Sequence, residues 1–182
     1  AIVHEALEFV RPIRLQVERT SVDEVLRSAA TLAARKLPER AVRVRLALPE
    51  ALPPIQGDQH QLRQLFTNLL INAFEAMSGR GSVRIVATEL PEEEGTSGGE
   101  AHVGAMVQVD VTDDGPGVPP DVMDRIFSPF FTTKPQGTGL GLAIVRKIVN
   151  AHDGRIDVQV PSAGGTQFRV TLPVSSEHGL FR

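Results

Sequence analysis

Apolar residues alternate with polar ones in some stretches of the chain and recur every three to four positions in others. Alternation places side chains on the two faces of a strand, whereas the longer period gathers apolar side chains along one face of a helix. The patterns predict strands at 42–48, 83–90, 107–111, 156–160 and 167–172, and helices at 1–10, 22–36, 58–77, 120–126 and 141–152. This order of elements favours a two-layer α/β sandwich over strict βαβ alternation.

Capping and turn residues support several of these boundaries. Thr20 or Ser21 is expected to cap the second helix, and Asp58 opens the third. Asp153-Gly154 ends the last helix, and Gly79-Arg80-Gly81 is expected to turn the chain into a strand. The stretch 91–104 is acidic and rich in Gly and Ser, so we expect a loop between two strands.

The first ten residues carry an apolar helical stripe with no capping residue ahead of it. The stripe consists of Ile2, Val3, Leu7 and Val10, and it stops at Arg11-Pro12. Because proline cannot continue a helix, the segment is expected to be the tail of a longer helix that begins before this sequence.

Composition narrows the class of protein. The chain has 182 residues, 41% of them apolar and 23% charged, which is enough for one globular domain. It has no Cys, which excludes disulfides and thiolate zinc sites. The net charge of −3 does not favour nucleic-acid binding, and no apolar run approaches the ~20 residues of a membrane span.

The third predicted helix has two chemically different faces. Its apolar arc consists of Leu62, Leu65, Phe66, Leu69, Ala73 and Met77. Asn68, Asn72 and Glu75 lie on the opposite side, spaced so that they are neighbours along the helix. These three residues are either a solvated polar face or oxygen ligands in a cleft, of the kind that Mg²⁺ uses together with substrate phosphates.

A second candidate site follows the strand at 107–111. Asp113-Asp114-Gly115-Pro116-Gly117 is either a tight turn or a site where glycines let the backbone approach a flat ligand. A carboxylate at the end of a strand can accept a hydrogen bond from an exocyclic amine, such as adenine N6.

Two further segments are adjacent in the chain. Phe127, Phe130 and Phe131 lie within five positions and are either core residues or part of a site. They lead to 137–142, where three glycines alternate with other residues before a helix. Backbone N–H groups and a helix N-terminus in this arrangement suit an anion, and Lys134 and Thr138 add a charge and a hydroxyl. The spacing matches neither a Walker P-loop nor a dinucleotide fingerprint.

In this order, these blocks resemble the catalytic and ATP-binding domain of bacterial sensor histidine kinases, within the gyrase, Hsp90, histidine kinase and MutL superfamily. The matching segments are Asn68–Ala73 (N box), Asp113-x-Gly115-x-Gly117 (G1 box), Phe127–Phe131 (F box), Gly137–Leu142 (G2 box) and Gly165–Phe168. The likeness covers residues 20–173 and is greatest to kinases of the nitrogen-regulation type. It implies a Bergerat-type fold, with a mixed, mostly antiparallel sheet of about five strands packed on three helices.

The resemblance also implies roles for individual residues. Asn72 would ligate Mg²⁺, Asn68 would support the phosphates, and Asp113 would bind adenine N6. Catalysis would rest on Asn68, Asn72 and Lys134. ATP would contact Asn68, Asn72, Glu75, Asp113, Gly115, Gly117, Val118, Phe127, Thr132, Thr133, Lys134, Gly137, Thr138, Gly139, Leu140, Gly141, Leu142 and Thr166. Many family members carry Lys or Arg where Glu75 stands, and an aromatic residue where Ala76 stands.

The same resemblance implies a division of the chain and a set of partners. Residues 1–19 would be the end of a dimerisation and phosphoacceptor hairpin, 20–174 the ATP-binding domain, and 175–182 a tail. His4 is not expected to be the phosphoacceptor, because the family's acceptor lies a whole helix further upstream. We expect this fragment to be monomeric, the parent protein to be a cytoplasmic or membrane-anchored homodimer, and a response regulator to receive the phosphoryl group. No nucleic-acid or membrane contact is expected of this fragment.

Three alternatives remain at the level of sequence. A water-activating ATPase of the gyrase, Hsp90 or MutL type is disfavoured, because Asn68 stands where those enzymes carry a glutamate. A serine kinase of the anti-sigma type shares the fold but often lacks the hairpin remnant. The third is a nucleotide-binding module that is inactive in isolation.

Overall fold

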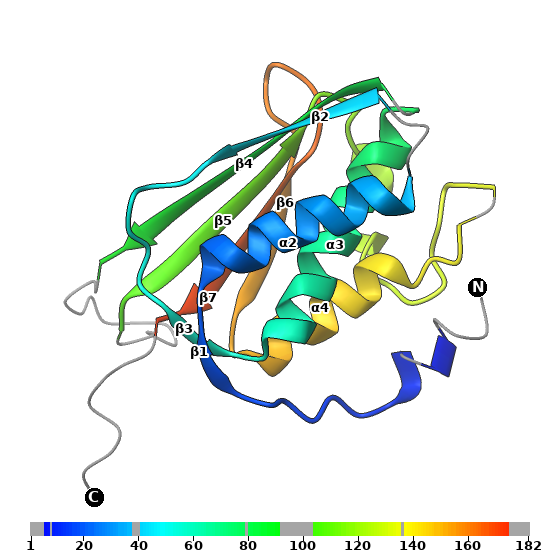
Figure 1. The fold of residues 1–182 in the computed structure, drawn as a ribbon. Coiled ribbons are helices and arrows are strands. Elements are labelled where there is room, and N and C mark those ends of the chain that lie inside the picture. Colours follow the sequence, from blue (N-terminus) through cyan, green and yellow to red (C-terminus); the bar gives the residue numbers. More distant parts are fainter. Residues whose placement is uncertain are drawn as a thin grey trace, which may run out of the picture.

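A computed structural model describes residues 6–7, 9–37, 41–78, 80–91, 104–135 and 137–174. One layer is a five-stranded sheet, and the other contains three helices that cover one face of it (Figure 1). The elements are β1 (Glu18–Thr20), α2 (Val22–Lys36), β2 (Ala41–Ala47), β3 (Ile55–Gly57), α3 (Gln59–Ala76), β4 (Arg80–Leu90), β5 (Met106–Asp113), η1 (Pro120–Arg125), α4 (Gly141–Ala151), β6 (Arg155–Gln159) and β7 (Gln167–Pro173). The predicted α/β sandwich is confirmed.

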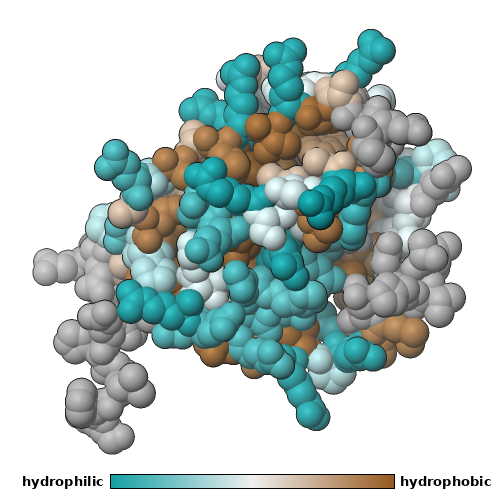
Figure 2. Space-filling view, in the orientation of Figure 1, coloured by the Kyte–Doolittle hydropathy of each residue, from teal (hydrophilic) through white to brown (hydrophobic). Residues whose placement is uncertain are grey.

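The main sheet has the order β2-β4-β5-β7-β6. Only β2 and β4 run parallel; every other neighbouring pair is antiparallel, so the sheet is mixed and mostly antiparallel as expected. Along β5 every second residue is buried, and Val107, Val109 and Val111 pack into the core beneath the helices. Figure 2 shows apolar residues gathered in the upper part of the face that carries α2 and β2, with polar residues over its centre.

The helix starts follow the predicted capping chemistry. Ser21 caps α2 by accepting a hydrogen bond from the Glu24 N–H at 3.4 Å. Asp58 caps α3, where its Oδ1 accepts from the Gln61 N–H at 3.0 Å. Each cap satisfies a backbone donor that has no partner within the helix. The predicted apolar arc of α3 is buried from Leu62 to Met77.

Three features differ from the sequence prediction. The strands β1 and β3 form a separate antiparallel pair of three residues each, too short for an alternating pattern to indicate them. The segment at 120–126 is a 3₁₀-helix rather than an α-helix, and its buried neighbour is Ile126. The strand β4 begins at Arg80, because Arg80 and Gly81 already pair with β2 instead of forming a turn.

The segment before β1 is anchored to the helical layer. Phe9 packs against the core, whereas Leu7 and Val10 of the predicted stripe are exposed. Lys147 of α4 donates hydrogen bonds to the carbonyl oxygens of Phe9 and Arg11, the latter at 2.6 Å. Asp58 adds a second anchor, because its Oδ2 accepts from the Gln16 N–H at 2.9 Å.

Some predictions fall outside the described residues. These are the predictions for Ile2, Val3 and His4, for the interior of the loop at 92–103, and for the tail at 175–182. None of the helices among the described residues is long and apolar enough to span a membrane.

Candidate ATP-binding site

The predicted site residues come from four separate parts of the fold. They lie on the C-terminal half of α3, at the end of β5, at the start of β7, and in the segment from η1 to α4, hereafter the lid segment (residues 127–140). The turn after β5 lies against the C-terminal end of α3, since a Cβ on Gly115 would be 3.3 Å from Met77 Cγ. The sheet and α3 therefore bring the second candidate site beside the first.

Asp113 is the last residue of β5 and is 4% exposed. Its Oδ1 accepts hydrogen bonds from the Gly115 N–H at 2.8 Å and the Thr166 N–H at 3.2 Å. Its own N–H donates to the Thr166 carbonyl at 2.9 Å. No hydrogen bond from any residue that the structure describes reaches Oδ2, so this oxygen can accept one from a ligand.

The two neighbouring aspartates lie in opposite electrostatic surroundings. Burial raises the pKa of Asp113, although N–H donors from Gly115 and Thr166 and the charge of Lys134 act against the shift. For Asp114, the Ser82 N–H lowers the pKa, at 3.0 Å from Oδ1 and 3.1 Å from Oδ2. Asp113 is therefore the buried carboxylate of the two, whereas Asp114 fastens the turn to β4.

Glycines let the turn from 162 to 165 approach Asp113. Gly165 has a φ of 83°, and a Cβ there would collide with the Asp113 carbonyl oxygen. Gly117 also has a φ of 83°, and a Cβ there would lie 3.1 Å from the Gly165 carbonyl oxygen. A side chain at either position would force the two turns apart.

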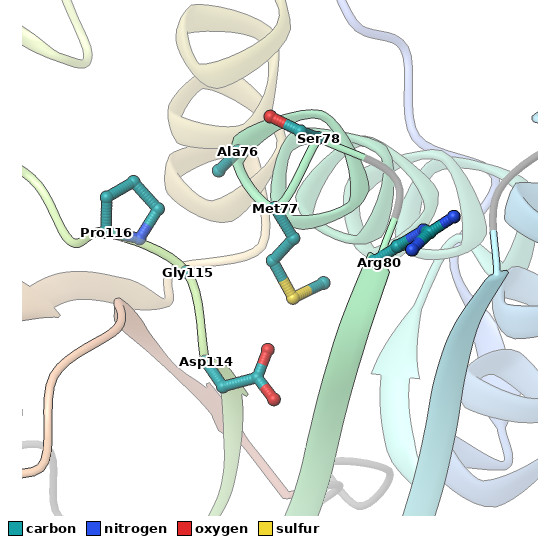
Figure 3. A pocket seen from close by; sticks show the side chains of 7 residues that line it. All are labelled: Ala76, Met77, Ser78, Arg80, Asp114, Gly115 and Pro116. Atoms are coloured by element: carbon teal, nitrogen blue, oxygen red, sulfur yellow. The ribbon is translucent and has the colours of Figure 1, made fainter.

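A hollow of about 370 Å³ opens beside this turn. It is lined by Ala76, Met77, Ser78, Arg80, Asp114, Gly115 and Pro116. Figure 3 shows Met77, at the end of α3, reaching toward Asp114 at the end of β5. The lining combines the Met77 thioether and the glycine turn with the polar side chains of Arg80 and Asp114. Asp113 is not among the lining residues, so the hollow lies next to the predicted adenine site and is not formed by Asp113.

A cluster of polar side chains lies further along the same face of α3. Lys134 of the lid segment donates from Nζ to Asn72 Oδ1 at 2.7 Å and to Glu75 Oε2 at 2.7 Å. Asn72 is half-buried, and Asn68, one helical turn earlier, is half-buried without a hydrogen bond to any described residue. Asn72, Glu75 and Lys134 are thus brought together as one polar group.

The chemistry of this group suits a hard cation held partly by a ligand. In the described part of the chain, no three acidic or histidine side chains gather into a group that could hold a metal by themselves. Asn72 Oδ1 already accepts from an ammonium cation, so a positive charge is accommodated at this oxygen. Mg²⁺ commonly takes few protein ligands and completes its shell with phosphates and water, which fits Asn72.

Local turns shape the lid segment. Thr132 Oγ1 accepts from the Lys134 N–H at 3.0 Å, and Thr138 Oγ1 accepts from the Leu140 N–H at 3.3 Å, just before α4. Gly139 has a φ of 69°, and a Cβ there would lie 2.7 Å from the Phe131 backbone nitrogen. Phe130 also has a positive φ, of 64°, and is 65% exposed. Thr133 and Gly137 are exposed, and Gly141 begins α4.

Other predicted contacts lie deeper in the fold. Phe127 meets the buried Phe168 edge-on, with ring centroids 6.2 Å apart, and Arg146 lies over its ring at 5.8 Å. Val118 and Leu142 are half-buried against the core. Phe127 begins the lid segment and Leu142 follows it, whereas Val118 lies before η1. The contact of all three residues with a nucleotide stays a prediction.

The sequence analysis missed several residues that shape the site. It did not link Ser82 to Asp114, place Met77 at the hollow beside Asp114, or bring Lys134 to Glu75. The pair Gly164-Gly165 is typical of a hairpin turn, in which both central residues can have a positive φ, so it carried no separate signal for the close approach to Asp113. The Lys134–Glu75 contact left no signal, since 59 residues separate the two.

Comparison with known proteins agrees with this geometry. Residues 57–176 match the family described as histidine kinase-, DNA gyrase B- and HSP90-like ATPase. The chain belongs to this family. The match includes α3, β5, the lid segment and α4, so the site described above lies inside the ATPase-like domain.

Named relatives of this ATPase-like domain are sensor kinases. The chain is 35% identical to the sensor histidine kinase ZraS of Escherichia coli (strain K12) over 174 residues, 96% of this chain and 35% of ZraS. It is 45% identical to the sensory histidine kinase/phosphatase NtrB of Rhodobacter capsulatus over 130 residues, 69% of this chain and 35% of NtrB. The chain therefore spans about a third of the length of these relatives.

Solved structures share the fold along almost the whole chain. Full-length ShkA in complex with AMPPNP superposes with a TM-score of 0.77 at 30% identity, over 96% of this chain and 35% of ShkA. The histidine kinase ThkA in complex with the response regulator TrrA gives 0.73 at 29% identity, over 97% of this chain and 47% of that one.

Proposed function

We propose that this ATPase-like domain is the catalytic part of a sensor histidine kinase and transfers the γ-phosphoryl group of ATP to a histidine. The observation that carries the proposal is that the turn after Asp113 lies against the C-terminal end of α3, the helix whose Asn72 accepts a hydrogen bond from Lys134. Burial raises the pKa of Asp113, and Lys134 is close enough for its charge to act against that rise. A single nucleotide can therefore meet both groups. The names of ZraS and NtrB, and the AMPPNP complex of ShkA, support this function.

The adenine end would be recognised by the strand-end carboxylate. Asp113 Oδ1 is occupied by two backbone donors, so Oδ2 would accept the N6 amino group of adenine. Gly115 leaves room beside the carboxylate, because a Cβ there would lie 2.9 Å from Asp113 Oδ1. A base with a carbonyl at this position, such as guanine, would meet an acceptor with an acceptor and bind poorly.

The phosphate end would be stabilised by Asn72, Lys134 and the lid segment. When bound at Asn72, Mg²⁺ would neutralise charge on the phosphate oxygens. Lys134 would place its ammonium beside the triphosphate. In the reaction, an imidazole nitrogen forms a bond to Pγ while the bond from Pγ to the bridging oxygen of ADP breaks. Asn68 supports phosphates but has no basicity to activate water, which favours transfer over hydrolysis.

The partners follow from this chemistry. The acceptor histidine would lie in a dimerisation domain of the same protein, and a response regulator would take the phosphoryl group from it. The solved complex of ThkA with TrrA supports the second step. We infer a cytoplasmic setting for this domain, where ATP and response regulators are found.

A transfer assay tests the proposal. The chain is incubated with γ-labelled ATP, Mg²⁺ and a separately produced dimerisation domain from a nitrogen-regulation kinase. We expect acid-labile, base-stable label on that domain, and no label with Asn72→Asp. Rapid phosphate release without labelled protein would support an ATPase instead, and nucleotide binding with neither outcome would indicate an inactive module.

A further inference from the structure

The ion pair between the lid segment and α3 is unusual among those of the described residues, because it also involves a predicted metal ligand. Lys134 Nζ lies 2.7 Å from Glu75 Oε2 and 2.7 Å from Asn72 Oδ1. Asn72 and Glu75 are three residues apart on α3 and are therefore neighbours along the helix. The ammonium group thus bridges two acceptors on one face of the helix.

The pair is too exposed to matter much for folding. The side chains of Lys134 and Glu75 are 32% and 38% exposed, and ion pairs of this kind contribute little to stability. The contact with Glu75 instead fixes the position of the Lys134 ammonium group. A free lysine loses rotamer entropy when it is immobilised, so a lysine that is already held by Glu75 loses less when phosphates arrive.

The two acceptors of Lys134 have different fates when a nucleotide binds. Asn72 Oδ1 cannot keep the ammonium close once it ligates a divalent cation, because the two positive charges repel each other. Glu75 is then the acceptor that remains. The backbone of Lys134 is held in its turn by Thr132 Oγ1 and by the Gly137 N–H, which donates to the Lys134 carbonyl at 3.1 Å. The ammonium therefore stays near the phosphates as long as Glu75 retains it.

We propose that Glu75 is a positioning residue that acts through Lys134. Its carboxylate holds the lid ammonium beside Asn72, where the triphosphate and its cation bind, and it keeps the ammonium there after Asn72 Oδ1 is taken. A lysine and glutamate pair positions a phosphate-binding lysine in protein kinases in a comparable way, on a different fold. The proposal rests on the function proposed above, because it assumes that the ligand is a nucleoside triphosphate.

A double-mutant cycle with two ligands tests this role. Binding of ATP and of AMP, each with Mg²⁺, is measured by calorimetry for the wild type, Glu75→Gln, Lys134→Met and the double variant. We expect Glu75→Gln to weaken ATP binding about fivefold and Lys134→Met about tenfold, with AMP changed by less than about twofold. In the Lys134→Met background, Glu75→Gln should not weaken ATP binding further.

Two more variants separate positioning from general structure. Glu75→Asp keeps the carboxylate and should retain most of the ATP affinity. Asp157→Asn removes an ion pair whose carboxylate is also 38% exposed, on β6, and should leave binding unchanged. Melting temperatures check that each variant is folded.

The outcomes are distinct. Equal weakening of ATP binding by Glu75→Gln with and without Lys134 would make Glu75 a direct ligand of the cation and overturn the proposal. Tighter ATP binding by Glu75→Gln would mean that the Lys134–Glu75 ion pair opposes nucleotide binding, and this result would also overturn the proposal. If the wild type bound no ATP, the proposed function itself would fail. If the wild type bound ATP but the effects of Glu75→Gln and Lys134→Met on ATP binding were additive, only the positioning role would fail.

Discussion

The purine end and the phosphate end of the proposed ATP site are held by different kinds of contact. At the purine end, Asp113 is buried and takes part in three hydrogen bonds with backbone groups of Gly115 and Thr166. At the phosphate end, Lys134 reaches Asn72 and Glu75 through side chains that are partly exposed. The first end is part of the sheet, and the second joins a helix to a loop.

This difference implies a division of labour in binding. Backbone contacts inside a sheet keep their geometry whether or not a ligand is present, so recognition of the base is preorganised. Side-chain contacts of a loop rearrange easily, and Asn72 must exchange the ammonium for a metal ion. We therefore expect changes at the purine end to affect folding and base affinity, and changes at the phosphate end to affect mainly the triphosphate.

The largest effect is expected at the contact between two turns of the purine end. A Cβ on Gly165 would collide with the Asp113 carbonyl oxygen at a φ of 83°. Gly165→Ala should lower the free energy of unfolding by about 3–5 kcal/mol, from overpacking and backbone strain combined. Gly164→Ala is the matched control, because its φ is 91° but its Cβ meets nothing within 4 Å. Equal denaturant midpoints for both variants would contradict the close approach.

A smaller effect is expected from the carboxylate that faces the base. Asp113→Asn keeps an oxygen for Gly115 and Thr166 but replaces the second acceptor with an amide donor. ATP binding should weaken by about 1.5–3 kcal/mol, the strength of a hydrogen bond to a charged group, with little change in melting temperature. Asp110→Asn is the control: Asp110 lies on the same strand as Asp113 and would lose its 2.8 Å ion pair with Arg169 of β7. An unchanged calorimetric titration for Asp113→Asn would remove it from the site.

Most of the fold could be predicted because its signals are local. The apolar arc of α3 and the alternation of β5 each extend over many residues, and Asp58 and Ser21 are strong caps. The β1–β3 pair could not be predicted, because each strand has only three residues. The paired residues also lie far apart in the chain: Thr20 pairs with Ile55 and Glu18 pairs with Gly57. Pairing at such distance depends on tertiary packing rather than on pattern.

In the candidate site, too, features with a local sequence signal could be predicted and contacts between distant segments could not. The residue types at the purine end could be predicted because one short motif, residues 113–117, supplies most of them. The contact of Lys134 with Glu75 could not be predicted, since it depends on how the lid segment folds back over α3. The role of Asp114 was hidden as well, because its partner Ser82 lies on another strand.

At the phosphate end, a backbone change in the lid should affect binding without unfolding the domain. Gly139→Ala places a Cβ against Phe130 and Phe131 at a φ of 69°. We expect ATP affinity to fall about fivefold, which corresponds to about 1 kcal/mol of lid strain, while the melting temperature changes little. Gly104→Ala, whose Cβ meets nothing within 4 Å, is the control for glycine replacement. A loss of stability as large as that of Gly165→Ala would erase the contrast between the two ends.

The smallest effect is a pH dependence confined to the purine end. Burial raises the pKa of Asp113 above that of the same residue in the unfolded chain. Between these two pKa values, Asp113 is protonated in the folded protein and ionised in the unfolded chain. As pH rises through that interval, stability relative to Asp113→Asn should fall, while ATP affinity relative to Asp113→Asn should rise as the carboxylate forms. Taking the ratio of wild type to variant cancels the titration of the ATP phosphates themselves. Paired melting and calorimetric titrations from acidic to neutral pH measure both trends. A flat stability ratio would mean that Asp113 titrates as it does in the unfolded chain, and a flat affinity ratio would mean that its charge does not affect ATP binding.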